Sequence, residues 1–323
     1  MFPQNKQKHI LVTGGSGFLG GRLVSKLSKY KSFSVVSGSR KLQPGLANVH
    51  NVGWSRLDLT DNASIERACK GVDVLIHLAG VDASTCAALP ETAFNINTIG
   101  TAKILKAAGK YGVTQFIYMS TAHVYGENLR STVDENSSVI NPSLYGSSHL
   151  AAEHMALHAS KKHMMNVTCL RLSNGFGIPA FPETKCWSLV VNSLCKEAAE
   201  TGKITIKSPI DIERNYVSVS HVESVILKLI NYEGKHQNFD VVNIGGSFSF
   251  SLSELASKIS KSFSDVHGKK IEVRYLSEDF VQQTSSLKYK SLVSKNFGIK
   301  PEKEVVFDGE LNSVVNYCLR GVL

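Results

Sequence analysis

Apolar and polar positions in the first half of the chain repeat one unit: a short apolar run, a glycine or polar turn, and a stretch with apolar residues at helical spacing. The runs that predict strands are His9–Thr13, Phe33–Ser37, Val72–Ala79, Thr114–Ser120 and Val167–Leu172. The stretches that predict covering helices are Phe18–Lys29, Asn95–Lys110 and Pro142–Lys161. Because strands that alternate with helices are joined by right-handed crossovers, this order predicts a doubly wound parallel α/β sheet of Rossmann type.

The alternation loosens after Gly177. Later segments with a recognisable pattern are a helix at Trp187–Glu200, sheet-like stretches at Asn215–Tyr232 and Asn238–Ile244, and a helix at Ser251–Phe263. We therefore predict a sheet domain over residues 1–177, to which residues 215–245 return. A smaller, interleaved C-terminal domain should comprise residues 178–214 and 246–323.

The turn after the first strand carries a glycine trio. Residues His9–Gly20 read HILVTGGSGFLG, so Gly14, Gly17 and Gly20 lie between an apolar strand and a helix. There the first glycine permits a tight turn, the second lets the backbone approach a pyrophosphate, and the third lets helix and strand pack closely. Such a trio can be a purely structural turn, but in this context it predicts dinucleotide phosphates at the helix N-terminus.

The end of the second strand bears on which dinucleotide binds. A carboxylate there would bind the ribose hydroxyls of NAD, whereas the sequence reads VVSGSRK, with Ser39, Arg40 and Lys41 and no acid. Cations suit a 2′-phosphate, so we expect NADP(H) in preference to NAD(H); the alternative is that both charges are merely solvated. Asp58, in RLDLTD after the third strand, either contacts the adenosine or caps the helix that begins near Asp61.

Composition narrows the class of protein. The 323 residues are 42% apolar, enough for a globular core, and no apolar run has the length of a membrane span or a signal peptide. The 6 cysteines lie far apart without a CxxC pair, which predicts reduced thiols in the cytoplasm and no metal site. The net charge of +9 suits an anionic small molecule, because no basic run is interleaved with aromatic residues as in a nucleic-acid track.

Several motifs together resemble one family. They are TGGSGFLG at 13–20, HLAG at 77–80, NINTIGTAKIL at 95–105, STAHVYG at 120–126, YGSSH at 145–149, RLSNGFG at 171–177, ERNYVSVSHV at 213–222 and VNIGG at 242–246. Their order and spacing are similar to those of the nucleotide-sugar epimerase/dehydratase branch of the extended short-chain dehydrogenases, over nearly the whole chain. The resemblance implies an NAD(P)-dependent enzyme whose C-terminal domain holds a nucleotide sugar, and a homodimer formed through the helices at 95–110 and 142–161.

The resemblance also implies roles for individual residues. It makes Tyr145 the catalytic acid/base and Thr121 the catalytic hydroxyl that holds the substrate oxygen. It places Asn174 on the substrate and Arg214 on its diphosphate. The implied dinucleotide contacts are Gly14, Gly17, Phe18, Leu19, Ser39, Arg40, Asp58, Leu59, Leu78, Ala79, Gly80, Asn97, Tyr145 and His149, of which Asn97 matches the family's structural asparagine.

One position departs from the family's pattern. The pKa of a tyrosine is about 10, so the side chain is protonated at neutral pH. Nearby positive charge must lower that pKa before the tyrosine can accept a proton from a sugar hydroxyl. In the family a lysine four residues after the tyrosine supplies that charge, and here the residue is His149. Protonated, with Glu153 favouring that form, His149 could replace the lysine; neutral, it could hydrogen bond to a ribose hydroxyl. The alternative is a site that is weakened or inactive.

Further histidines bear on the reaction type. The family's 4,6-dehydratases carry an Asp-Glu pair directly after the catalytic threonine, where this chain has Ala122 and His123, so dehydration is disfavoured. His123 is either a further acid/base that faces the sugar or an ordinary side chain. His154 and His158 have the i, i+4 spacing of metal ligands, but no third ligand is evident and we expect a solvated helix face.

The sequence thus supports two main hypotheses. The first is an enzyme that transfers a hydride at a sugar carbinol carbon, either an epimerase that retains its cofactor or a keto-sugar reductase that consumes NADPH. The second is an NAD(P)-binding regulatory or scaffold protein without turnover. Nucleic-acid binding is poorly supported, and the sequence predicts neither the sugar nor the nucleotide base.

Overall fold

The computed structural model describes residues 7–126, 129–140, 143–208, 210–234, 238–277, 281–282 and 287–321. The chain forms two compact units. Unit 1 comprises Met1–Gly126, Ser138–Arg171 and Ile226–Val242, and unit 2 comprises Glu127–Ser137, Leu172–Val225 and Asn243–Leu323. Both units are discontinuous in sequence, so the smaller unit is interleaved with the sheet domain.

Unit 1 is built on a sheet with the strand order β12-β7-β5-β4-β1-β2-β3. The strands are β1 (Lys8–Thr13), β2 (Phe33–Ser39), β3 (Val52–Arg56), β4 (Val74–His77), β5 (Gln115–Thr121), β7 (Asn166–Leu172) and β12 (Phe239–Ile244). The pairs from β3 across to β5 are parallel, and Thr13 of β1 lies between Gly38 of β2 and His77 of β4. The order reverses direction at β1, which confirms the predicted doubly wound α/β sheet.

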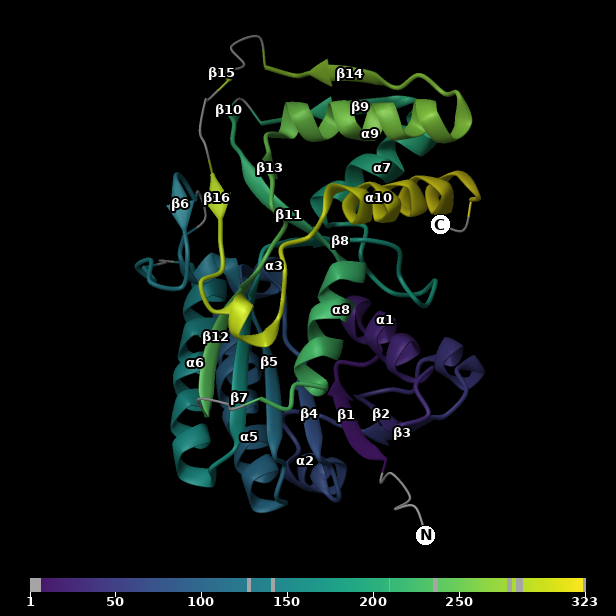
Figure 1. Cartoon of the computed structure of the whole chain (residues 1–323). Coiled ribbons are helices and arrows are strands. Elements are labelled where there is room, and N and C mark those ends of the chain that lie inside the picture. The colour runs from purple at the N-terminus through teal and green to yellow at the C-terminus, as the bar shows by residue number, and fades with distance from the viewer. Residues whose placement is uncertain are drawn as a thin grey trace. The chain divides into compact units, whose positions relative to one another are not determined.

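Three helices of unit 1 lie side by side on one face of this sheet (Figure 1). They are α2 (Asn62–Cys69), α5 (Thr101–Lys110) and α6 (Leu144–His163). Their apolar faces share one core with alternate residues of the strands, including Leu11, Phe116 and Val167. Outside that core, α1 (Phe18–Leu27) packs against β1 and β2. Shorter helical segments are η1 (Pro44–Asn48), α3 (Ala83–Ala88), α4 (Pro90–Ala93), the π-helix η2 (Phe94–Gly100) and η3 (Ala122–Val124).

The predicted elements of unit 1 differ from the observed ones mainly at their ends. The strand predicted over Val72–Ala79 contains the shorter β4, and the helix predicted over Asn95–Lys110 begins as η2 before it becomes α5. The helix predicted over Pro142–Lys161 begins at Leu144, because the Ser143 hydroxyl accepts a hydrogen bond from the Gly146 N–H at 3.2 Å and caps the first turn. Pro142 lies outside the described residues.

Unit 2 contains small sheets and longer helices. Its strands are β6 (Thr132–Val133), β8 (Asn174–Phe176), β9 (Lys203–Ile206), β10 (Ile210–Asp211), β11 (Arg214–Ser218), β13 (Ser249–Phe250), β14 (Glu272–Tyr275), β15 (Val281–Gln282) and β16 (Lys288–Tyr289). Its helices are α7 (Val190–Thr201), α9 (Leu252–His267), α10 (Glu304–Leu319) and the short η4 (Ser294–Phe297), while α8 (Val219–Ile230) begins in unit 2 and ends in unit 1. Phe176, Phe263 and Phe307 lie in the core that α7, α9 and α10 share.

The predicted return of residues 215–245 to the main sheet needs a correction. β12 joins that sheet, whereas β11 pairs with β8 and β13 in unit 2. The remainder of the stretch predicted over Asn215–Tyr232 is not sheet, because Val219–Ile230 form the helix α8. The Asn215 amide anchors β11 there, because it donates hydrogen bonds to the carbonyls of Gly246 at 3.0 Å and Phe248 at 2.7 Å. Apolar alternation predicts that a segment is a strand but does not predict which sheet it joins.

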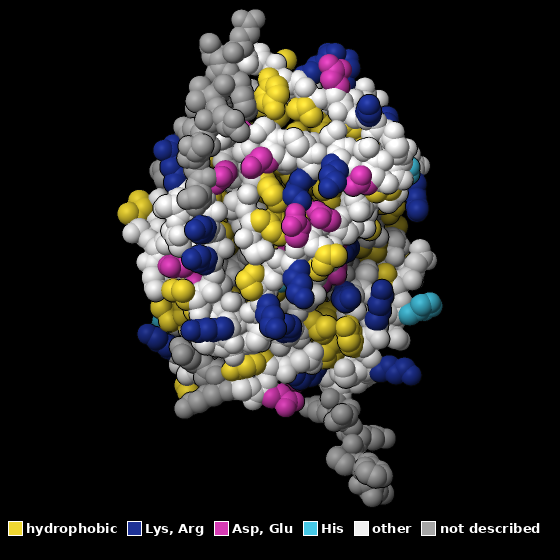
Figure 2. All heavy atoms as spheres, turned by 45° about the horizontal axis from the view of Figure 1, so that its top comes forward, with side chains coloured by type: hydrophobic (Ala, Val, Ile, Leu, Met, Phe, Trp, Pro, Cys, Tyr) yellow, Lys and Arg dark blue, Asp and Glu magenta, His cyan; other side chains and the backbone are white. Residues whose placement is uncertain are grey.

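The helices of the described residues and the charges on one face of the molecule bear on what the protein could bind. No helix in the described ranges combines the length and the apolar character needed to cross a membrane. On the face drawn in Figure 2, lysine and arginine side chains are interspersed with acidic and hydrophobic ones.

A buried carboxylate in unit 2 binds Ser218, the residue that precedes α8. Glu302 is 1% exposed and accepts hydrogen bonds from the Ser218 hydroxyl and from the Ser218 N–H, the latter at 3.1 Å. Burial raises the pKa of Glu302 to about 7, so the folded state binds its proton more tightly than the unfolded chain does. The protonated Glu302 therefore stabilises the folded state; this stabilisation is complete below about pH 4.5 and is lost as the pH rises to about 7. Its full size is on the order of 3 kcal/mol.

We therefore expect Glu302→Gln, which cannot ionise, to remove part of the pH dependence of stability. Chemical denaturation at a series of pH values should show wild type losing stability relative to Glu302→Gln as the pH rises through this window. Glu304→Gln is the matched control, because Glu304 is an exposed carboxylate that pairs with Lys258. Identical pH profiles for wild type and Glu302→Gln would contradict the prediction.

Candidate active site

The glycine loop joins β1 to α1 in a conformation that larger residues would disrupt. Gly14 has φ of +69°, and a Cβ atom on it would lie 2.9 Å from the Ala79 nitrogen. A Cβ atom on Gly20 would lie 2.1 Å from the Gly14 carbonyl oxygen. These contacts make glycine necessary at both positions, and the first shows how closely Gly14 approaches the loop after β4.

The first turn of α1 is open to an anion. Gly17 is its N-cap, no side chain caps it, and no acidic residue lies in the first turn. Free N–H groups at a helix N-terminus favour a phosphate. The residues present therefore fit the pyrophosphate of a dinucleotide, with Phe18 and Leu19 partly exposed in the same turn.

The loop after β4 is held beside the glycine loop by side chains of unit 1. Thr13 Oγ1 accepts hydrogen bonds from the N–H groups of Leu78 and Ala79, each at 3.2 Å. Asn97, which is 1% exposed, accepts from the Val81 N–H at 2.8 Å and donates to the Ser148 hydroxyl at 3.1 Å. Asn97 thus braces this loop against α6. Gly80 is exposed next to it, and the Leu59 side chain belongs to the sheet core.

Ser39, at the end of β2, forms a hydrogen bond with Trp54 in the middle of β3. The Ser39 hydroxyl donates to the Lys41 carbonyl at 2.7 Å and accepts from Trp54 Nε1 at 3.0 Å. Arg40 and Lys41 are exposed beside this pair. The β2 end therefore presents cations and an indole ring, with no carboxylate of its own.

Asp58 lies close to these cations. Hydrogen bonds from the Thr60 hydroxyl and N–H lower the pKa of Asp58, and the charges of Arg40 and Arg56 lower it further. The helix cap is instead Asp61, whose carboxylate accepts from the N–H groups at the start of α2. Of the two roles considered for Asp58, the structure excludes the cap.

Thr121 and Tyr145 meet where β5 ends and α6 begins. Burial raises the pKa of Tyr145 to about 12, an effect that a hydrogen bond with the Thr121 hydroxyl partly offsets. Thr121 Oγ1 also accepts a hydrogen bond from the His123 N–H at 3.2 Å, and the His123 ring lies edge-on to Tyr145 with centroids 5.7 Å apart. Three predicted site residues are therefore brought together.

The His149 ring packs directly against the Tyr145 ring. Their ring centroids are 4.6 Å apart, and His149 Nδ1 lies 2.8 Å from the Tyr118 hydroxyl oxygen. His149 is 8% exposed, and burial lowers its pKa to about 4. It is therefore neutral at physiological pH and does not supply the positive charge of a lysine.

Glu153 does not act on His149. Its carboxylate is paired in a bidentate arrangement with Arg171, at 3.0 Å and 2.7 Å, and accepts from the Ser120 hydroxyl at 2.5 Å. Arg171 also donates to the Tyr125 hydroxyl at 2.8 Å. The idea that Glu153 favours a protonated His149 is therefore wrong, because the arginine already neutralises this carboxylate.

The predicted substrate residues lie on neighbouring strands of unit 2. The Asn174 amide on β8 donates to the Asn215 carbonyl of β11 at 2.8 Å, and Arg214 begins β11. Burial raises the pKa of Tyr216 to about 12, although the positive charge of Arg214 nearby lowers it. The first of these contacts shows that Asn174 helps to pair the two strands.

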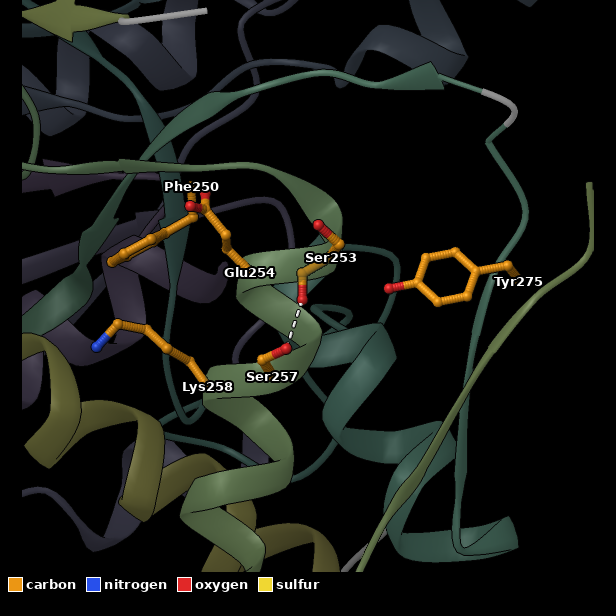
Figure 3. Close-up of a pocket in the computed structure, with 6 residues that line it drawn as sticks. All are labelled: Phe250, Ser253, Glu254, Ser257, Lys258 and Tyr275. Carbon is orange, nitrogen blue, oxygen red and sulfur yellow. Dashed lines mark hydrogen bonds between the residues drawn. The ribbon is translucent and has the colours of Figure 1, made fainter. Parts of the chain in front are cut away.

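Two other features lack the character of an active site. Within the described ranges no three potential metal-ligating side chains gather, and both His154 and His158 are exposed. A hollow of about 460 Å³ in unit 2 is lined by Phe250, Ser253, Glu254, Ser257, Lys258 and Tyr275 (Figure 3). Its lysine is paired with Glu304 and Asp308, and none of the predicted site residues lines it.

Residues that the sequence did not identify as part of the site are Tyr118, Arg171, Trp54 and Arg56. A signal existed for Arg171, because an arginine inside the apolar run VTCLRL must be paired if it is buried. Tyr118 lies in an apolar strand and carries no comparable signal. Arg56 and Trp54 depend on the β2 to β3 pairing, which places Trp54 beside Ser37 and Arg56 beside Ser39.

Comparison with known proteins places these features in a family. The model of the NAD dependent epimerase/dehydratase family matches residues 10–245. The dTDP-D-glucose 4,6-dehydratase of Mus musculus is 27% identical over 271 residues, which are 80% of this chain and 73% of that protein.

Solved structures share the fold at lower identity. UDP-glucose 4-epimerase of Thermotoga maritima, solved with UDP-glucose, has a TM-score of 0.80 and 23% identity, and the match covers 98% of this chain and 100% of that one. RMD from Pseudomonas aeruginosa, complexed with NADPH, has a TM-score of 0.77 and 21% identity, with 98% of each chain covered.

Proposed function

Because the chain belongs to the NAD-dependent epimerase/dehydratase family, we propose that it transfers a hydride at a carbinol carbon of a nucleotide-activated sugar. The observation that carries this proposal is the hydrogen-bonded pair of Thr121 and Tyr145. It lies at the carboxyl edge of the same sheet whose β1 ends in the glycine loop. Tyr145 would exchange the hydroxyl proton, Thr121 would hold the substrate oxygen, and Asn174 and Arg214 would contact the nucleotide sugar.

The protonation states favour the reductive direction. With a pKa of about 12, Tyr145 holds its proton at neutral pH and can donate it to a carbonyl oxygen. Neutral His149 adds no charge that would favour the tyrosinate needed to accept a proton. The dinucleotide, when bound, supplies the hydride. The carbonyl carbon of a keto-sugar gains that hydride, its oxygen gains the Tyr145 proton, and solvent restores the phenol.

Dehydration is not part of the proposal, although curated relatives are named 4,6-dehydratases. After Thr121 this chain carries Ala122, whose side chain cannot donate a proton to a leaving hydroxyl. His123 remains as a titratable group beside Tyr145. We therefore assign it contact with the sugar and not an elimination step.

We propose NADP(H) as the dinucleotide, with NAD(H) as the alternative. The cations Arg40, Lys41 and Arg56 gather where β2 and β3 end, and a 2′-phosphate would offer them an anion. Arg40→Asp should lower the affinity for NADPH by about ten- to a hundredfold, the value of one charge-assisted hydrogen bond, and should not weaken NADH binding, because a carboxylate here can bind the ribose hydroxyls. Fluorescence titration of both dinucleotides measures this ratio.

Lys106→Asp is the control for net charge, because Lys106 is exposed on α5. It should leave the preference between the two dinucleotides as in wild type. An unchanged preference in Arg40→Asp would mean that Arg40 is only solvated and that the preference for NADP(H) is unsupported.

A second candidate function is favoured by the neutral His149: a protein that binds NAD(P) and a nucleotide sugar without turnover.

A homodimer, expected from the resemblance, remains part of either proposal. Exposed Ile99 of η2 and Met155 of α6 would suit an apolar contact between the two subunits.

The test is mass spectrometry of the dinucleotide carried by the purified protein, followed by turnover over a panel of nucleotide sugars and keto-sugars. Consumption of NADPH by a keto-sugar supports the reductase, and sugar interconversion without net consumption indicates an epimerase. Binding without turnover in wild type, together with turnover in His149→Lys, would rule out the enzyme hypothesis and favour the hypothesis of a non-catalytic binding protein. No dinucleotide binding would refute both.

A further inference from the structure

A line of buried polar side chains connects the glycine loop to the interior of α6. Thr13 Oγ1 accepts from two backbone N–H groups, so its own proton goes to His77 Nδ1, 2.7 Å away. His77 must then carry its proton on Nε2, which lies 3.0 Å from Thr101 Oγ1. Thr101 in turn donates to the Asn97 carbonyl at 2.6 Å. The hydrogen bonds therefore determine the donor and the acceptor at each step from Thr13 through His77 to Thr101.

Tyr118 continues the line to His149. Burial raises the pKa of Tyr118 well above its usual value, so the phenol keeps its single proton. Thr101 also hydrogen bonds to Tyr118; it donates its own proton to Asn97 and accepts from His77, so one lone pair of its oxygen is left to compete with His149 for the phenol proton. His149 Nδ1, at 2.8 Å from the Tyr118 oxygen, has no other partner in the described part of the chain. Nδ1 is therefore the favoured acceptor for the phenol proton.

We propose that Tyr118 donates to His149 Nδ1 and so fixes the neutral tautomer that carries its proton on Nε2. His149 then offers the ribose of a bound dinucleotide an uncharged N–H donor in the place of an ammonium group. Tyr118 is a positioning residue, since it acts through His149. The inference rests on the proposed function for its ligand, but the tautomer itself is a property of the protein alone.

The groups around His149 support a neutral ring. The titratable side chains that face it are Tyr118 on β5, Tyr145 on α6, His123 on η3 and His77 on β4. The nearest carboxylate along α6, Glu153, is paired with Arg171. No facing group is an anion that would favour an imidazolium, and the charge of His123 would oppose one. The Nε2–H donor should therefore persist over roughly pH 5.5 to 8.5.

Long-range proton–nitrogen NMR of protein labelled with ¹⁵N-histidine, without dinucleotide, tests the tautomer directly. The expected spectrum of wild type has His149 protonated on Nε2 alone throughout that pH range. In Tyr118→Phe the ring should lose this single preference and show protonation at Nδ1 as well. A wild-type ring protonated on Nδ1, or on both nitrogens at neutral pH, would overturn the proposal whether or not the protein binds a dinucleotide.

Dinucleotide titration tests the consequence. Tyr118→Phe should bind about three- to tenfold more weakly than wild type, the value of one hydrogen bond. His149→Gln, which keeps a neutral N–H donor, should bind more tightly than His149→Ala. Tyr111→Phe is the matched control, because it removes a phenol hydrogen bond to Glu66 outside the site, and should bind as wild type does. Equal affinities for His149→Gln and His149→Ala, in protein that binds normally as wild type, would contradict the donor role and leave the proposed function standing.

Discussion

Replacing Tyr145 with phenylalanine is expected to lower kcat by a factor of about 10² to 10⁴, the usual contribution of one acid/base group. The ring would still fill the space between His123 and His149, whose ring centroids lie 5.7 and 4.6 Å from its own, so the fold should be preserved. Dinucleotide affinity should change by no more than about tenfold, since only one hydrogen bond is lost. The effect should therefore appear in kcat and not in the unfolding midpoint.

The pH profile gives a second measure of the same role. Reduction requires the protonated phenol, and the pKa of Tyr145 is about 12, so the reductive rate should stay flat through neutral pH and fall only as the pH approaches that value. Steady-state assays of wild type, Tyr145→Phe and the control Tyr111→Phe measure both effects. Full activity in Tyr145→Phe would show that Tyr145 takes no part in proton transfer.

Replacing Arg171 with methionine is expected to lower the free energy of unfolding by about 3 to 5 kcal/mol. The Arg171 and Glu153 side chains are 7% and 3% exposed, so the substitution leaves a buried carboxylate without its counter-charge. Glu153 also bonds Ser120, the neighbour of Thr121, so loss of the pair should loosen the junction of β5 and α6. Chemical denaturation measures the change in stability.

The double variant Glu153→Leu with Arg171→Met separates charge from packing. Removing both charges should recover most of the lost stability, because hydrophobic residues of similar size often replace a buried ion pair without loss. Arg274→Met is the control, as Arg274 forms an exposed pair with Glu272 and should leave the midpoint unchanged. A double variant as unstable as Arg171→Met would show that the loss in the free energy of unfolding comes from the changed packing and not from the unpaired charge.

Local sequence signals predicted much of unit 1. The apolar strands and the glycines at 14, 17 and 20 fix where β1 turns into α1, because their constraints act within a few residues. Tyr145 and His149 were placed on one helix face by their spacing, and they do lie together. The family resemblance supplied Thr121, which lies on β5 and not on that helix.

The charge state of the site depends on contacts that are distant in sequence. Glu153 was expected to act on His149 one turn away, but it pairs with Arg171 on β7. Tyr118 comes from β5, and its bond to His149 spans 31 residues of sequence. Short-range spacing could predict neither partner, since each depends on how α6 packs on the sheet. The same reason explains β11, whose pairing in unit 2 depends on Asn215 and the β13 turn.

The central claim, hydride transfer between a dinucleotide and a sugar carbinol carbon, is tested most directly with NADPH that carries deuterium at the transferable nicotinamide position. The protein is incubated with this dinucleotide and a panel of nucleotide keto-sugars, and the products are analysed by mass spectrometry and NMR. We predict carbon-bound deuterium at the carbinol carbon in wild type and its absence in Tyr145→Phe. Deuterium that stays on a bound dinucleotide, with every sugar unlabelled, would contradict the claim.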